Sequence, residues 1–233
     1  MPSDAAALAK LRQSIDCLEQ TQSRLSRTIP VADAVDCYLP YGGIPAGCIH
    51  EVKGASLANA IAFAAILGAR LAGKQGHILY IAPDRFLHPL GLLPYAVKLD
   101  RLFHVSARRS RDLAWAVMEA LRCPQVSSVM AVLSGLNLTE SRRLQLAAET
   151  SGATGFLLSH AASQPVASAI TRWKISPVIG KSGQRFDQPL WMAELSYCRG
   201  GRPGKWLLEW HEQKLNSIRT QPLEQTAREA LAG

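Results

Sequence analysis

The loop that follows the first expected strand has the position, but not the residues, of a loop that binds nucleotide phosphates. Such a loop needs glycines that let backbone N–H groups surround the phosphates, a lysine that reaches the β- and γ-phosphates, and a hydroxyl for magnesium. Only Gly54 fits this pattern, and Ser56 follows it inside the loop. Asn59 stands at the second glycine, Ala60 at the lysine and Ile61 at the hydroxyl. We therefore expect no tight ATP binding, because little is left to offset the charge of a triphosphate.

Two groups of arginines are candidates for binding phosphates or an acidic partner. Arg108, Arg109 and Arg111 lie where a strand ends and a helix begins, on the side of an open sheet at which ligands usually bind. Arg142 and Arg143 lie early in a later helix, where a cation is mildly unfavourable against the helix dipole. That cost makes a binding contact at this pair more attractive. Solvated surface charge is the alternative for both groups.

Two further segments combine cations with an aromatic ring or with a tight turn. In the first, Trp173 can stack on a base while Arg172 holds a phosphate, although a tryptophan in a strand is more often part of the core. In the second, Arg199, Arg202 and Lys205 project from a glycine-rich hairpin tip. We expect this tip to contact a protein or a nucleic acid, with a purely structural turn as the alternative.

Short β-rich runs alternate with helical ones over most of the chain, which predicts an α/β domain with a mostly parallel sheet flanked by helices. The strands expected here cover residues 49–52, 77–82, 102–106, 126–133 and 155–160, and the helices cover 58–71, 89–97, 111–122 and 139–150. Strand-like runs at 169–176, 190–197 and 205–210 predict an extension by C-terminal antiparallel strands. We assign residues 1–30 to an N-terminal helix, 31–210 to the core domain and 211–233 to a polar tail.

The composition is that of a globular protein, and we expect it to lie in the cytoplasm. The chain has 233 residues, 48% of them hydrophobic, which is enough for one sizeable core. Its formal charge of +8 favours an acidic partner such as a nucleic acid, a nucleotide or an acidic protein face. The longest apolar run, 57–69, is shorter than the roughly 20 residues that span a bilayer, and we see no secretory signal. The cysteines and histidines lack metal-ligand spacing, so we expect no metal and no cofactor.

Three stretches resemble the core of RecA-type recombinases and their relatives: residues 42–54, 80–89 and 95–99. In this resemblance Asp84 falls at the position of the catalytic acid, and residues 161–170 correspond to a DNA-facing loop. The run 129–133 matches the magnesium-binding strand in hydrophobicity, but Leu133 occupies the place of its aspartate. The resemblance thus implies a RecA-like core without its ATP chemistry, in which Asp84 is a relic acid with no positioned phosphate to act on.

A closer resemblance, to the ImuA family, covers nearly the whole chain. It is carried by the phrases at residues 138–149, 171–174 and 198–206, followed by Glu209-Trp210. ImuA proteins are RecA-like accessory proteins of bacterial inducible-mutagenesis cassettes. The resemblance implies a protein of the DNA-damage (SOS) response that acts in translesion synthesis with an ImuB-type Y-family polymerase relative and an error-prone replicative-type polymerase. It also implies contact with RecA and with single-stranded DNA.

Three functions follow as hypotheses. We favour a non-catalytic RecA-fold adaptor, which has lost its ATPase parts and kept surfaces that bind RecA, ImuB or DNA. The second is an atypical ATPase in which backbone amides around Gly54 and Asp84 suffice. The third is a cell-division inhibitor like SulA that binds a tubulin-like protein, because members of the ImuA family are sometimes described in that way.

Overall fold

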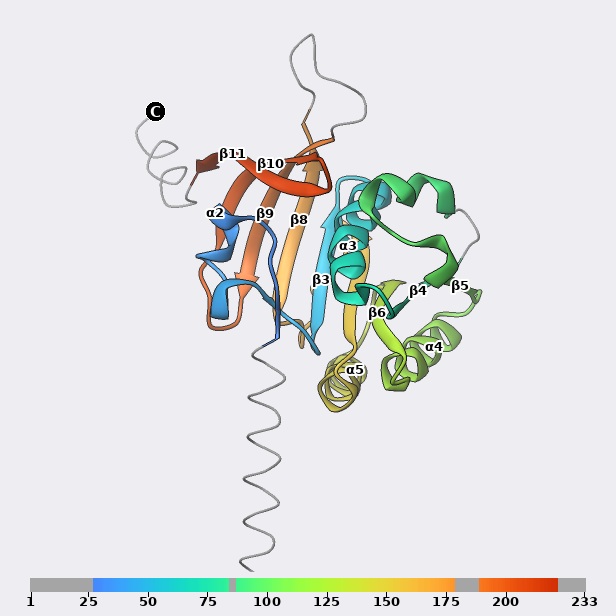
Figure 1. The fold of residues 1–233 in the computed structure, drawn as a ribbon. Coiled ribbons are helices and arrows are strands. Elements are labelled where there is room, and N and C mark those ends of the chain that lie inside the picture. The colour runs from blue at the N-terminus through green and yellow to red at the C-terminus, as the bar shows by residue number, and fades with distance from the viewer. Residues whose placement is uncertain (1–26, 84–86, 179–188, 222–233) are drawn as a thin grey trace, which may run out of the picture.

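A computed structural model describes residues 27–83, 87–178 and 189–221 of the chain. Within these residues the main sheet has nine strands, in the order β11-β10-β9-β8-β3-β7-β6-β4-β5 (Figure 1). The helix expected over residues 1–30 falls mainly on residues outside the described part, and its last residues include the short strand β1 (Thr28–Ile29). Asp84 also lies outside the described residues.

The parallel strands are neighbours in the sheet and extend to one of its edges. Within the described chain they are β3 (Ile49–Gly54), β4 (His77–Ala82), β5 (Leu102–Ser106), β6 (Val126–Val132), β7 (Thr154–His160) and β8 (Thr171–Pro177). Every residue of β3 is buried, although His50, Glu51 and Lys53 are polar. The α/β fold with a mostly parallel sheet, predicted from the alternation of β-rich and helical runs, is confirmed.

The antiparallel extension consists of β9 (Leu190–Cys198), β10 (Gly204–His211) and β11 (Lys214–Gln221). The first two match the expected runs, and β11 lies where we expected a polar tail. A strand forms there because β10 supplies its hydrogen-bond partners and Leu215 is buried against the core. An antiparallel strand with one face in water needs few apolar residues, so its sequence signal is weak.

Helices cover both faces of the sheet. α3 (Leu57–Ala72) packs on one face, and α4 (Ser110–Arg122) lies beside α5 (Leu138–Ser151) on the other (Figure 1). Side chains of β7 alternate between the two layers, because successive strand residues point to opposite faces. Phe156 and Leu158 join the core under α3, while Leu157 joins the core under α4 and α5.

Short elements complete the described fold. They are α2 (Asp33–Asp36), the 3₁₀ helices η1 (Pro40–Gly42), η2 (Pro89–Tyr95) and η3 (Leu99–Arg101), and β2 (Ile44–Pro45), which pairs with β1. We expected one helix over residues 89–97. The structure has the 3₁₀ helix η2 instead, because Pro94 inside it has no N–H to continue an α-helical ladder.

Aromatic side chains hold the antiparallel strands against α3. Trp173 of β8 lies between Phe63 of α3 and Trp206 of β10, with ring centroids 5.4 Å and 6.2 Å away. The ring of Tyr38 meets Trp206 edge to face at 5.1 Å. Large rings packed in this way contribute much of the buried area of a core. The extension is therefore part of the main domain and not an appendage.

Candidate functional site

The turn between β3 and α3 is too short to surround a phosphate group. β3 ends at Gly54 and α3 begins at Leu57, so only Ala55 and Ser56 lie between them. The Ala55 N–H donates to the carbonyl of Ile175 at 2.9 Å. A Cβ on Gly54 would lie 2.0 Å from the Ser56 oxygen, so this glycine is required by the turn itself. The backbone donor that a phosphate would need from Ala55 is therefore already used.

The side chains at the other motif positions serve packing and local hydrogen bonding. Ala60 is fully buried, and Ile61 packs against the core under α3. The Asn59 amide donates to the Ser56 hydroxyl at 2.9 Å, and its oxygen accepts from the indole N–H of Trp191 at 3.3 Å. The structure therefore brings together the five residues of the expected degraded loop as a closed turn at the start of α3. They are Gly54, Ser56, Asn59, Ala60 and Ile61.

A buried charge cluster, which the sequence reasoning missed, lies on β3 beside this turn. The Glu51 side chain is 1% exposed and accepts from the Val166 N–H at 3.2 Å. Its carboxylate also lies 3.7 Å from the ammonium of Lys53 and 3.6 Å from Nε of Arg172. Burial raises the pKa of Glu51, and Lys53, the Val166 N–H and Arg172 oppose that rise. The signal in the sequence was the charged residues Glu51 and Lys53 at alternate positions of a short strand that begins a buried α/β core.

The cluster fixes the path of the segment 161–170, which the resemblance equates with a DNA-facing loop. Lys53 donates to the carbonyl of Ser163, and Arg172 donates to the carbonyl of Val166 at 3.1 Å. The Ser168 hydroxyl donates to the carbonyl of Ser141 at 2.7 Å. This segment therefore lies fastened to the sheet and to α5.

Of the two alternatives for Trp173, stacking on a base or a place in the core, the structure supports the core. Its side chain is 1% exposed in the aromatic core, and its indole N–H donates to the Thr171 hydroxyl at 3.0 Å. A base has no access to that ring. Arg172 is also committed within the protein, since it faces Glu51 and stacks over the Tyr197 ring at 4.7 Å.

The hairpin tip between β9 and β10 lies on the body of the protein. The Arg202 N–H donates to the carbonyl of Tyr38 at 2.9 Å, and its guanidinium stacks over the Tyr38 ring at 5.0 Å. Arg199 and Arg202 are exposed, and Lys205 is half-buried. Because Cys198 pairs with Thr171, where β8 begins, this tip lies at the amino ends of the parallel strands.

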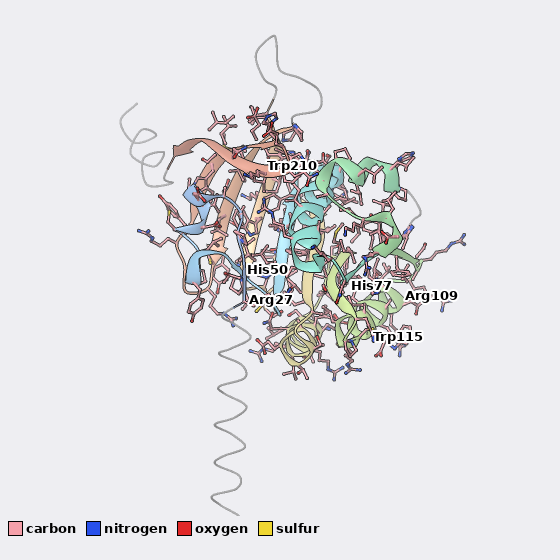
Figure 2. The ribbon with its side chains drawn as sticks, viewed as in Figure 1. Arg27, His50, His77, Arg109, Trp115 and Trp210 are labelled. Carbon is pink, nitrogen blue, oxygen red and sulfur yellow. The ribbon has the colours of Figure 1, made fainter. Side chains whose placement is uncertain are left out.

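The two predicted arginine groups come together at α4 and α5. Arg111 and Arg143 line one groove between these helices, which has a volume of about 490 Å³. Arg108 and Arg109 are exposed just before α4, and Arg142 is exposed on α5. Arg109 projects from the side of the molecule that carries α4 (Figure 2). These arginines are well separated in the fold from the hairpin tip, which lies at the opposite end of the parallel strands.

The same groove contains Trp115, whose side chain is 66% exposed (Figure 2). The sequence analysis did not single it out, although helical spacing could have found it. Leu113 and Val117 are buried on the sheet side of α4, and Trp115 lies midway between them and so points away from the sheet.

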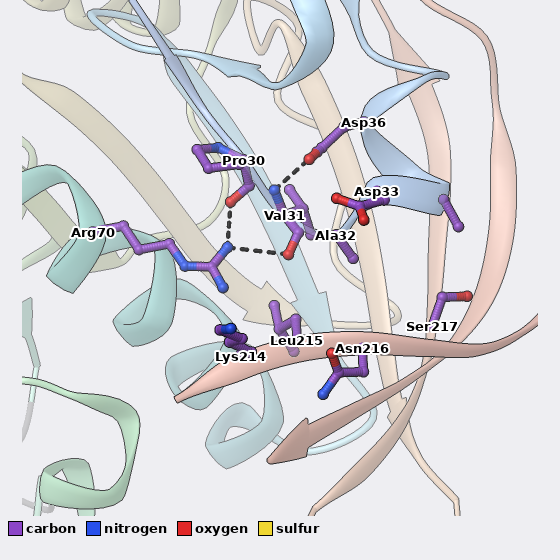
Figure 3. A pocket seen from close by; sticks show the side chains of 11 residues that line it. Pro30, Val31, Ala32, Asp33, Asp36, Arg70, Lys214, Leu215, Asn216 and Ser217 are labelled. Atoms are coloured by element: carbon purple, nitrogen blue, oxygen red, sulfur yellow. Dashed lines mark hydrogen bonds between the residues drawn. The ribbon is translucent and has the colours of Figure 1, made fainter. Parts of the chain in front are cut away.

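A second hollow, of about 580 Å³, is lined by Arg70, Asp36 and residues 214–217 (Figure 3). Arg70 donates to the carbonyls of Pro30 and Val31, and the Val31 N–H donates to the Asp36 carboxylate at 2.8 Å. Burial raises the pKa of Asp36 and lowers that of Arg70. These groups hold residues 30–36 against α3, so the hollow is explained by the packing of the chain.

Two classes of site find no support in the described part of the structure. No helix there is both long and apolar enough to cross a bilayer. Within the same residues, no three histidine, cysteine, aspartate or glutamate side chains gather in an arrangement that could hold a metal ion.

Comparison with known proteins identifies relatives over most of the chain. No protein-family model matches the chain. Protein ImuA of Caulobacter vibrioides strain NA1000 / CB15N is 34% identical over 200 residues, covering 77% of this chain and 81% of the relative. Protein ImuA of the C. vibrioides strain ATCC 19089 / CIP 103742 / CB 15 matches to the same extent. Identity at this level over most of both chains shows common descent, and the chain therefore belongs to the ImuA family.

Proposed function

We propose that this protein is a non-catalytic adaptor with a RecA-like core that supports translesion DNA synthesis after DNA damage. Membership of the ImuA family supports its involvement in the translesion mutagenesis system. In that system it binds RecA and an ImuB-type Y-family polymerase relative, and contacts single-stranded DNA, so that an error-prone replicative-type polymerase can act. It hydrolyses no nucleotide in doing so.

The closed β3–α3 turn is the observation that carries the non-catalytic part of the proposal. A triphosphate at this position would have to break the hydrogen bond from Ala55 to Ile175. It would find the buried methyl group of Ala60 where a lysine is needed to offset its charge. Both changes oppose binding, and Lys53, a described cation beside the turn, is already engaged with Glu51 and the carbonyl of Ser163.

Exposed cations outside the turn support the binding part of the proposal. The arginines at α4 and α5 are exposed on the helices that cover one face of the sheet, and those of the hairpin tip are exposed at the amino ends of the parallel strands. A protein that holds partners together needs such separate surfaces, and arginine is well suited to bind carboxylates and phosphates.

Direct titration with magnesium and ATP tests the loss of catalysis. We expect no saturable binding by calorimetry, whereas a RecA-type recombinase titrated in the same buffer binds. Saturable, magnesium-dependent binding would overturn this part of the proposal and favour the atypical ATPase.

Co-purification tests the adaptor role. We expect the tagged full chain to retain the ImuB-type protein and RecA, with and without single-stranded DNA. The double variant Arg199→Ala with Arg202→Ala should weaken that capture without changing the unfolding temperature, while Lys74→Ala, an exposed cation elsewhere, should not. A deletion strain should lose damage-induced mutation. Unchanged mutation, together with filamentation on overexpression in cells lacking the mutagenesis partners, would favour the division inhibitor instead.

A further inference from the structure

The groove between α4 and α5 has an apolar floor that is open to water. Its floor and walls include Ala114, Met118, Leu136 and Leu144. The groove follows α4 from Arg111 to Arg122, which is about 16 Å of helix. That length corresponds to about three turns of a second helix lying alongside.

Trp115 supplies a large exposed ring at this groove. Leaving two thirds of an indole in water forgoes the favourable free energy of burying its apolar surface. Tryptophan and arginine are the residue types most enriched among the side chains that dominate binding energy at protein interfaces. Here both types line the same groove, because Arg111 is one helical turn before Trp115 on α4.

The charge available at the groove is positive. Its two carboxylates are already engaged: Glu119 pairs with Arg122 at 3.1 Å, and Glu140 accepts the Asn137 N–H in the capping box that starts α5. Arg111 and Arg143 form no salt bridge with any carboxylate in the described part of the chain. Arg108 and Arg109 shortly precede Arg111 in the chain, Arg142 directly precedes Arg143, and all three are exposed.

We propose that this groove binds an acidic, amphipathic helical segment of a partner protein in the translesion assembly. Apolar side chains of the segment, spaced three and four residues apart, fill the floor beside Trp115. Its carboxylates pair with Arg111 and Arg143 on either side. This inference rests on the proposed adaptor function and adds the surface and the chemistry of the partner segment.

The lining of the groove favours a peptide over a nucleic acid. A single strand needs a continuous positive track for its phosphates and rings on which successive bases stack. This groove instead offers an aliphatic floor and one exposed indole ring, with arginines at separate points along its sides. An apolar helix face with acidic flanks matches these features.

Fluorescence polarisation with the full chain tests the inference. The probes are labelled 20-residue peptides that tile the ImuB-type protein and RecA. We expect the tightest-binding peptides to be acidic, with apolar residues on one helical face, and the affinity to fall with added salt. Trp115→Ala and Arg143→Glu should each weaken binding by about tenfold or more, whereas Lys74→Glu should leave it unchanged. Thermal unfolding checks that each variant is folded.

Several outcomes would overturn the inference. One is that the tightest-binding peptides are basic or lack an apolar face. Another is that Trp115→Ala and Arg143→Glu leave peptide binding unchanged. Displacement of the peptides by oligothymidylate, with oligothymidylate binding itself sensitive to Trp115→Ala, would assign the groove to nucleic acid. Failure of the adaptor function is a different result, because the wild-type chain would then capture neither full-length partner. If the wild type and both variants captured the full-length partners equally well, the proposal for the groove would be refuted and the adaptor function would stand.

Discussion

Acid should destabilise this protein through one buried imidazole. His50 on β3 is fully buried, and its ring nitrogens lie 2.8 Å from the Thr171 hydroxyl and 2.8 Å from the carbonyl of Pro45. The carbonyl can only accept, so Nε2 carries the proton. Nδ1 then accepts from the Thr171 hydroxyl, which itself accepts the indole N–H of Trp173. The folded state thus holds a neutral imidazole, and burial lowers the pKa of His50 to about 4.

The magnitude follows from the difference in proton affinity between the folded and unfolded chains. In the unfolded chain the pKa of a histidine is about 6.5, so unfolding takes up a proton between about pH 6.5 and 4. The contribution of His50 to stability is therefore complete above pH 6.5 and is lost as the pH falls toward 4. Because one pKa unit is worth about 1.4 kcal/mol, the loss reaches about 2.5 kcal/mol by pH 4.5.

Urea denaturation at pH 7.5 and pH 4.5 measures this loss. The free energy of unfolding of the wild type should fall by about 2.5 kcal/mol more than that of His50→Gln, in which the titrating group is absent. His50→Asn provides the matched control: its stability at pH 7.5 can differ from that of the glutamine variant, but its pH dependence should be the same. If both variants kept the wild-type pH dependence, a neutral buried His50 would be refuted.

Two further predictions concern the hairpin tip and the buried charge cluster. A Cβ on Gly201 would lie 2.6 Å from the backbone carbonyl oxygen of Tyr38. Gly201→Ala should therefore lower the free energy of unfolding by about 1–3 kcal/mol, measured by thermal unfolding. Gly91→Ala is the control and should be nearly neutral, because the space around Gly91 is open. Equal effects would contradict the close packing of the tip. Glu51→Gln leaves two partly buried cations without a counter-charge and should cost about 1–3 kcal/mol in urea, with faster proteolysis within residues 161–170. Unchanged proteolysis would show that other contacts hold this segment.

Most of the fold was predictable because its signals are local. The strands at 77–82 and 102–106 were predicted with their observed bounds, and α3 and α5 each extend the expected helix by one residue at both ends. β11 was missed because its stability comes from pairing with β10, and a polar sequence contains no pattern that indicates such pairing. The prolines that turned residues 89–95 into a 3₁₀ helix were visible, and their effect was underestimated.

The site was predictable only in part, because several of its features depend on long-range contacts. The missing lysine and hydroxyl were visible in the sequence, but the use of the Ala55 N–H depends on Ile175, which is far away along the chain. Alternation in β8 places Trp173 on the same face as Thr171 and Ile175, which agrees with the core position that the sequence favoured for this tryptophan. The meeting of Arg111 with Arg143 required knowing that α4 and α5 are neighbours.

The way in which the segment 161–170 is fastened has a consequence for how this family can diversify. Lys53, Glu51 and Arg172 reach it only through backbone groups of Ser163 and Val166. A bond to a carbonyl or an amide is indifferent to the side chain that residue carries. The exposed positions of the segment, Ala161, Ala162, Gln164, Pro165 and Ala167, can therefore change identity over evolution while its course across the sheet is inherited.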